Sequence, residues 1–385
     1  MRYVMEKETF ERYIERFNEL FINKEKYVIF GSQFKAAEVR KKISNVLFYV
    51  DNDKEKWGEL IDGLEIKNPE VLKYQNVKII VAVSAYLQVF EQLKNYGISE
   101  ENYCSYKELL LIKEYLDKGT IYLPQIIFIT NSRCTLTCKG CIEYIPYIQK
   151  KKDFSFEEII SSVDNLFKCA EYVENVQFAG GEAFLHEKLG DIIKYCYEKY
   201  IVSDRAGNIS VVTNATLIPN ENLLNALKKY NVHVVMSNYK KAIQNKCKIE
   251  ELVEIFEQRG IKYNIENHFN RLESGKWFDM GSPFFCHNMT EIELKKYFEK
   301  CTISCFAVCD SKLFTCNAVR SSIMNLERIG TDNDYCDLRV DSKMKFLKYY
   351  LGYNDKGYYD FCNFCNGFGE YLNKTSIVPG EQGVL

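Results

Sequence analysis

The segment Cys134-Thr-Leu-Thr-Cys138-Lys-Gly-Cys141 determines how this chain is interpreted. It places three cysteines at the spacing CxxxCxxC directly after the apolar run Ile126-Ile-Phe-Ile-Thr130, which is typical of a buried strand. Three thiolates on one tight loop can hold three irons of a [4Fe–4S] cluster and leave the fourth iron without a protein ligand. An open metal position allows a small molecule to bind there. The spacing alone also permits a zinc site completed by a distant cysteine or histidine.

Polar segments also follow the next predicted strands. Gly180-Gly181-Glu182 follows the second strand, Thr213-Asn214-Ala215-Thr216 the third, and Ser237-Asn238 the fourth. We predict strands at 125–130, 176–179, 209–213, 232–236 and 262–265, and helices at 156–169, 187–200, 222–229 and 249–259. Repeated β–α units of this kind predict a partial (β/α)6 barrel, in which functional residues lie at the carboxyl ends of the strands.

These motifs, in this order, resemble the radical S-adenosylmethionine (SAM) superfamily, whose signature is CxxxCxxC after the first barrel strand. The resemblance implies that Cys134, Cys138 and Cys141 hold a catalytic [4Fe–4S] cluster. It also implies that Gly180, Gly181 and Glu182 bind the amino group of SAM, and that Thr213, Asn214 and Ser237 lie near its ribose and carboxylate. Many members have an aromatic residue after the second cysteine, where this chain has Lys139. We expect altered packing over SAM there, with cluster binding retained.

The same resemblance implies an enzyme that cleaves SAM reductively to a 5′-deoxyadenosyl radical, which then abstracts hydrogen from a substrate C–H bond. The cofactor supplies the difficult chemistry, and the protein positions it and excludes competing reactions. An electron donor such as flavodoxin or ferredoxin is the expected protein partner.

A second group of cysteines lies in the C-terminal block. The pattern Cys301-x3-Cys305-x3-Cys309, then Cys316, then Cys362-Asn-Phe-Cys365 resembles the twitch domain, the shorter relative of the SPASM domain. The resemblance implies a second, auxiliary [4Fe–4S] cluster held by Cys316, Cys362, Cys365 and either Cys301 or Cys305. A structural zinc is the alternative. Two cysteines, Cys286 and Cys309, remain unassigned; they are candidates for a hydrogen-atom donor or for simple packing.

This block departs from the twitch pattern at one position and resembles it in its last segment. Ser311 stands where the family has a glycine, and Asp310-Ser311 can still form the turn of a hairpin. The segment Ile377-Val-Pro-Gly-Glu-Gln382 resembles the way such domains end.

The N-terminal block predicts a Rossmann-like parallel sheet, with strands at 27–30, 46–50 and 77–83, a leading helix at 10–21 and a helix ending at 42. Gly31-Ser-Gln33-Phe-Lys-Ala36 occupies the place of a dinucleotide fingerprint, and Asp51 follows at the distance of a ribose-binding acid. The second glycine of the fingerprint is missing, so this is a poor NAD site. The stretch from Asp51 to Gly58 resembles Rossmann-like modules appended to glycan-locus transferases. Ligand binding and a purely structural role both remain open.

The chain of 385 residues is therefore expected to be α/β with three domains, at 1–117, 118–269 and 270–385. Its net charge of −2 gives no basic field for nucleic acid, and no apolar run is long enough to cross a membrane. None of its 15 cysteines precedes Cys104, and their clustering favours metal use in a cytoplasmic protein.

Three classes of function fit the sequence. The first is an enzyme that oxidises or epimerises a sugar-like or nucleotide-linked small molecule, which the Rossmann-like block favours. The second is a maturase of a ribosomally made peptide, a frequent role of twitch and SPASM enzymes. The third is a zinc-stabilised binding protein, which would be colourless where an iron–sulfur protein is brown.

Overall fold

The computed structural model describes residues 9–22, 26–83, 86–267, 277–302, 305–369, 372–373 and 375–383. The chain divides into two compact units, with the division between Ile121 and Tyr122. The barrel and the cysteine-rich block together form the second unit, and the boundary predicted at 269–270 lies outside the described residues. No described helix is long and apolar enough to span a bilayer.

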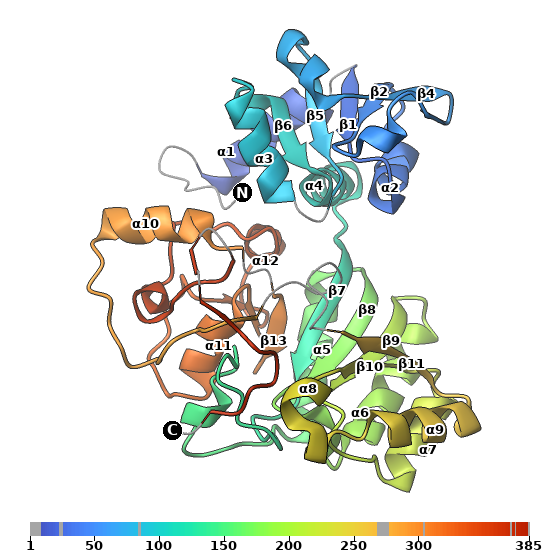
Figure 1. Cartoon of the computed structure of the whole chain (residues 1–385), viewed down its shortest axis with the longest axis vertical. Coiled ribbons are helices and arrows are strands. Elements are labelled where there is room, and N and C mark those ends of the chain that lie inside the picture. The colour runs from blue at the N-terminus through green and yellow to red at the C-terminus, as the bar shows by residue number, and fades with distance from the viewer. Residues whose placement is uncertain are drawn as a thin grey trace. The chain divides into compact units, whose positions relative to one another are not determined.

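The first unit is built on a six-stranded sheet in the order β3-β4-β2-β1-β5-β6 (Figure 1). Its strands are β1 (Tyr27–Phe30), β2 (Val46–Val50), β3 (Leu60–Ile61), β4 (Leu64–Lys67), β5 (Lys78–Val81) and β6 (Tyr103–Ser105). All neighbouring pairs are parallel except β3 with β4. Its helices are α1 (Phe10–Phe17), α2 (Phe34–Lys42), α3 (Tyr86–Asn95) and α4 (Tyr106–Lys118). The Rossmann-like parallel sheet is confirmed.

Two predicted bounds in this unit are wrong in detail. The leading helix ends as an α-helix at Phe17 and continues as a π-helical turn, Asn18–Ile22. The third strand is shorter than its apolar run: it covers Lys78–Val81, whereas Val77 and Val83 pack against the core from outside the sheet. Apolar side chains predict burial well, but strand ends depend on where pairing with a neighbour stops.

The second unit contains an eight-stranded sheet in the order β11-β10-β9-β8-β7-β13-β14-β15. Five strands follow one another as β–α units: β7 (Tyr122–Ile129), β8 (Tyr172–Ala179), β9 (Ala206–Thr213), β10 (His233–Ser237) and β11 (Lys262–Glu266). Their helices are α5 (Phe156–Cys169), α6 (Leu189–Cys196), α7 (Glu221–Lys229), α8 (Lys240–Ile243) and α9 (Ile249–Arg259). All five strands run parallel. The carboxyl ends that carry the motifs therefore share one edge of the sheet.

The sixth parallel strand of this sheet comes from the cysteine-rich block. β13 (Ala307–Cys309) pairs in parallel with β7, and β14 (Lys312–Phe314) and β15 (Cys336–Asp337) extend the sheet in antiparallel fashion. In Figure 1 this block, coloured orange to red, lies beside the β7 edge of the barrel strands. Asp310 and Ser311 form the turn between β13 and β14 with φ of 49° and 53°, the two positive angles of a type I′ hairpin. The hairpin predicted without its glycine does form.

The remaining elements of the block are α10 (Glu291–Lys300), α11 (Asn317–Met324), α12 (Lys343–Tyr350) and the short pair β12 (Trp277–Phe278) and β16 (Ser376–Ile377). Short helical turns lie at Lys54–Lys56, Pro69–Tyr74, Glu100–Asn102, Ile145–Tyr147, Ala183–Leu185, Tyr197–Ile201, Gln244–Lys246 and Asp360–Phe364. The pairing of β12 with β16 brings the 376–383 region back toward the barrel side of the unit.

Candidate iron–sulfur and SAM sites

The three cysteines of the CxxxCxxC loop lie together beyond the carboxyl end of β7. They belong to one cluster of apolar contacts with Leu136 and Ile243, which also includes Tyr239 and Cys247. Cys247 packs in the same cluster as the loop. A tight loop that brings three thiols together is the arrangement that a three-cysteine cluster site requires.

Hydrogen-bond donors surround these sulfurs. Cys134 Sγ accepts from Leu136 N and Asn214 Nδ2, both at 3.4 Å, and Cys138 Sγ accepts from Gln382 Nε2 at 3.5 Å. Burial raises the pKa of Cys138 to about 11 and that of Cys141 to about 12. A coordinating metal deprotonates such thiols outright, so these donors are placed to stabilise sulfurs that carry negative charge.

The two glycines after β8 are required by the path of the cysteine loop. A Cβ on Gly180 would lie 2.6 Å from Asn131 O, and one on Gly181 would lie 2.1 Å from Arg133 O. Both are far below van der Waals contact. The Gly-Gly pair thus lets the loop before Cys134 pass directly over the end of β8. This is a structural reason for the motif in addition to the role toward SAM that the resemblance implies.

Glu182 is buried and organises the neighbouring loop. Its Oε2 accepts from Asn214 N at 2.7 Å and its Oε1 from Phe184 N at 3.0 Å. Burial raises the pKa of this carboxyl, and the two backbone donors oppose that rise. The Thr213 side chain also hydrogen-bonds this carboxylate. About one lone-pair site of its two oxygens is then left, and binding of the SAM amino group by Glu182 stays a prediction.

The Thr213–Thr216 segment contacts the cysteine loop directly. Asn214 Nδ2 donates to Thr135 Oγ1 at 3.1 Å as well as to Cys134, and the hydroxyls of Thr135 and Thr216 lie 2.5 Å apart. Ser237, at the end of β10, is buried and hydrogen-bonds Tyr239, which neighbours all three loop cysteines. The residues predicted from four separate strand ends therefore converge around the CxxxCxxC loop.

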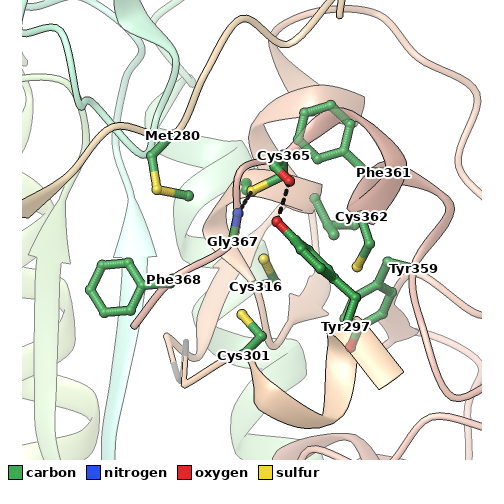
Figure 2. A pocket seen from close by; sticks show the side chains of 12 residues that line it. Met280, Tyr297, Cys301, Cys316, Tyr359, Phe361, Cys362, Cys365, Gly367 and Phe368 are labelled. Carbon is green, nitrogen blue, oxygen red and sulfur yellow. Dashed lines mark hydrogen bonds between the residues drawn. The ribbon is translucent and has the colours of Figure 1, made fainter. Parts of the chain in front are cut away.

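Four cysteines of the C-terminal block line one cavity of about 380 Å³, counting the part open to solvent. They are Cys301, Cys316, Cys362 and Cys365, and Figure 2 shows their sulfurs around the same space. Gly367 N donates to Cys365 Sγ at 3.3 Å, and Tyr297 Oη donates to Cys365 O at 2.6 Å. Cys305 is not among the residues that line the cavity. Of the two candidates for the first ligand, the geometry favours Cys301.

A single metal ion and an iron–sulfur cluster make different demands on the positions of their ligands. Within the described ranges, no three His, Cys, Asp or Glu side chains are grouped so that they could hold a metal ion. A single zinc needs every sulfur about 2.3 Å from the same atom, whereas a cluster distributes its thiolates over several irons. Which of the two the four thiols hold stays a prediction.

Two contacts that the sequence did not reveal join the two cysteine sites. Tyr144, three residues after Cys141, is fully buried, and its hydroxyl hydrogen-bonds Cys365. Arg320, one turn after Cys316, is fully buried and ion-paired with Glu143. Both contacts join residues distant in sequence, and no local motif marks them.

The unassigned thiols have different surroundings. Cys309 lines a small cavity with Ile159 and Ser162 of α5, which is a packing environment. Cys286 is half-buried. Burial lowers the pKa of Arg328, and the nearby Cys286 thiol opposes that fall. The Arg328 guanidinium lies 3.9 Å from the ring centroid of Phe364. A role as hydrogen donor stays a prediction for both, and the packing of Cys309 does not support it.

In the first unit, Asp51 is engaged within its own loop. Its carboxylate accepts from Ser32 Oγ at 2.5 Å, Asp53 N at 3.0 Å and Lys56 Nζ at 3.3 Å. Burial raises the pKa of Asp51, but these donors outweigh it and the pKa is lowered. Asp51, which stands at the spacing of a ribose-binding acid, therefore stabilises the loop that follows β2.

Comparison with known proteins agrees with this site. Residues 128–262 match the family described as the radical SAM superfamily, and this part of the chain is a radical SAM domain. This family implies a [4Fe–4S] cluster and SAM as cofactors.

Individual relatives match less of the chain. It is 29% identical over 94 residues to an S-adenosylmethionine-dependent nucleotide dehydratase of Selenomonas ruminantium, a stretch that spans 24% of this chain and 31% of that protein. The solved structures to which the chain is similar include native anSMEcpe with bound AdoMet. The match has a TM-score of 0.41 at 14% identity and covers 64% of this chain and 89% of the other. BtrN with AdoMet and 2-DOIA gives a TM-score of 0.39 at 14% identity, covering 66% and 98%. Both TM-scores are below 0.5, so no inference rests on them.

Proposed function

We propose that this enzyme cleaves SAM reductively and oxidises a carbinol carbon of a sugar-like or nucleotide-linked small molecule. The observation that carries the proposal is the convergence of Cys134, Cys138 and Cys141 with Glu182 and Asn214 at one edge of a parallel sheet. When bound, the cluster and SAM supply one-electron cleavage of the sulfonium and a 5′-deoxyadenosyl radical.

The contribution of the chain is to hold and shelter these groups. Three thiols bind the cluster, Asn214 donates to Cys134, and Glu182 fixes the backbone of Asn214. Leu136 and Ile243 cover the loop with apolar surface. Exclusion of water protects reactive intermediates from side reactions, so this buried setting suits radical chemistry.

Oxidation, as opposed to epimerisation, is favoured by the second cysteine site. Cys301, Cys316, Cys362 and Cys365 would hold an auxiliary [4Fe–4S] cluster, and a cluster ligated fully by protein supplies electron acceptance. The nucleotide-linked substrate class is supported by the Rossmann-like unit and by the partial similarity to a nucleotide dehydratase.

The test uses anaerobically reconstituted enzyme with SAM, dithionite and a panel of nucleoside diphosphate sugars in heavy water. We expect a product two hydrogens lighter than its substrate, with no solvent deuterium at the reacting carbon. A product of unchanged formula that carries one deuterium would show epimerisation, and loss of water would show dehydration. Either result would overturn oxidation. Turnover of a ribosomal peptide with no turnover of the panel would overturn the substrate class.

A further inference from the structure

The 377–383 segment pairs along the CxxxCxxC loop although the two are far apart in the chain. Lys139 N donates to Glu381 O at 2.8 Å, and Gly383 N donates to Thr137 O at 2.7 Å. These bonds flank an antiparallel bridge between Cys138 and Gln382. The backbone around the middle cysteine is therefore fixed by a segment of the C-terminal block.

Two glycines allow this close approach. Gly140, between Cys138 and Cys141, lies so near Ile377 that a Cβ would be 2.2 Å from Ile377 Cδ1. Gly380 has φ of +77°, and a Cβ there would lie 2.6 Å from Tyr239 Cβ. Gly140 lacks a side chain where the loop meets the segment, and Gly380 lacks one where the segment passes Tyr239.

The side chain of Gln382 uses both ends of its amide at this contact. Its Oε1 accepts from Thr137 N at 2.8 Å and from Thr137 Oγ1 at 3.3 Å. Its Nε2 donates to Cys138 Sγ at 3.5 Å and to Gly380 O at 2.6 Å. The carbonyl end therefore holds the loop, while the N–H end faces the sulfur.

We infer that Gln382 is a positioning residue of the catalytic cluster: its amide holds the loop and its N–H raises the reduction potential through a hydrogen bond to Cys138. The inference rests on the proposed function, because it takes Cys138 as a cluster ligand. Hydrogen bonds to cluster sulfurs stabilise the more negative, reduced state and so raise the potential. The 377–383 segment thus completes a site whose ligands all lie more than 200 residues earlier in the chain. Gln382 and its partner Cys138, for example, are 244 positions apart.

The test compares Gln382→Met and Gln382→Glu with the native enzyme. Both variants lose the N–H donor, but Gln382→Glu keeps an oxygen for Thr137 and so preserves the loop contact if Gln382→Met does not fold. The midpoint potential is measured by redox titration with electron paramagnetic resonance, following the signal that changes when SAM is added. Gln258→Glu, on the exposed face of α9, adds the same charge away from this contact and serves as the control.

We expect both Gln382 variants to shift this potential to more negative values, and Gln258→Glu to leave it unchanged. An unmoved potential in both folded Gln382 variants would overturn the inference while leaving the proposed function intact. If the native enzyme showed no SAM-responsive signal, both the inference and the proposed function would fail.

Discussion

At the scale of single residues, Arg320 and Glu143 form a buried ion pair. The Arg320 side chain is 0% exposed and that of Glu143 is 12% exposed. Burial lowers the pKa of Arg320 to about 9, and the nearby Cys141 thiol opposes that fall. The guanidinium therefore remains charged at neutral pH. Because Glu143 follows Cys141 closely and Arg320 follows Cys316 by one turn, the pair ties the two cysteine sites together.

Replacing Arg320 by methionine should leave a nearly buried carboxylate without its partner. We expect a loss of about 3–5 kcal/mol, because removal of one member of a buried pair strands the other charge. The readout is the apparent melting temperature of the reconstituted enzyme. The double variant Arg320→Met with Glu143→Met should melt well above the single variant, since no charge is stranded. A single variant as stable as the native protein would contradict this view of the pair.

Residues with a local signature were predictable, and residues defined by distant contacts were not. The cysteines, Gly180-Gly181-Glu182 and Asn214 stand in short motifs at strand ends, and the structure brings them together. Tyr144, Arg320 and Gln382 act through partners far away in sequence. Gln382 carried one signal, its place in a segment that resembles the end of twitch domains, but the sequence could not show which loop it meets.

At the scale of elements, Asp164 joins α5 to the α6 region. Its carboxylate accepts from Tyr195 Oη at 2.9 Å, Lys199 Nζ at 2.9 Å and Tyr200 Oη at 2.7 Å. Burial raises the pKa of Asp164, but the three donors outweigh burial and the pKa is lowered. The ionised carboxylate is therefore stabilised by the fold.

Replacing Asp164 by asparagine should destabilise the enzyme by about 1–3 kcal/mol, the contribution of hydrogen bonds to a charged group. Since the folded pKa is below the unfolded value of about 3.9, this stabilisation is complete above that value and is lost as pH falls through the folded pKa. The melting-temperature difference between native and variant should thus be equal at pH 8 and pH 6. A difference that already shrinks between those pH values would mean that the carboxyl pKa is not lowered.

Elements with complete local signals matched their predicted bounds. α5 covers Phe156–Cys169 as predicted, because Ser155 and Glu158 form a capping box at its start. The pairing of β13 with β7 was not predictable, because a three-residue strand carries little pattern and its partner is distant in sequence. The predicted number of six parallel strands is therefore right, but the sixth strand comes from the C-terminal block.

At the scale of the whole molecule, the division between Ile121 and Tyr122 separates the Rossmann-like sheet from every cysteine assigned to a cluster. The assigned cysteines are Cys134, Cys138, Cys141, Cys301, Cys316, Cys362 and Cys365. α4 ends at Lys118, and Gly119 closes it in a left-handed conformation. The second unit thus begins just after a defined helix end.

A fragment that begins at Gly119 should bind iron and cleave SAM, because all residues assigned to that step lie in the second unit. We expect the same iron content and the same rate of 5′-deoxyadenosine formation, within about twofold, as in the full chain. The comparison is made on anaerobically reconstituted protein with dithionite and no added substrate. A soluble fragment with full iron content that failed to cleave SAM would show that the first unit takes part in the reaction.

The central claim is that Cys134, Cys138 and Cys141 hold the cluster that cleaves SAM, apart from a second cluster in the C-terminal block. The most direct measurement is the iron content and 5′-deoxyadenosine yield of reconstituted native enzyme and of the Cys134→Ala, Cys138→Ala, Cys141→Ala triple variant. We predict about eight irons and 5′-deoxyadenosine for the native enzyme, and about four irons with no 5′-deoxyadenosine for the variant, from two cubes of four irons. A triple variant that still formed 5′-deoxyadenosine, or native protein that bound zinc and no iron, would contradict the claim.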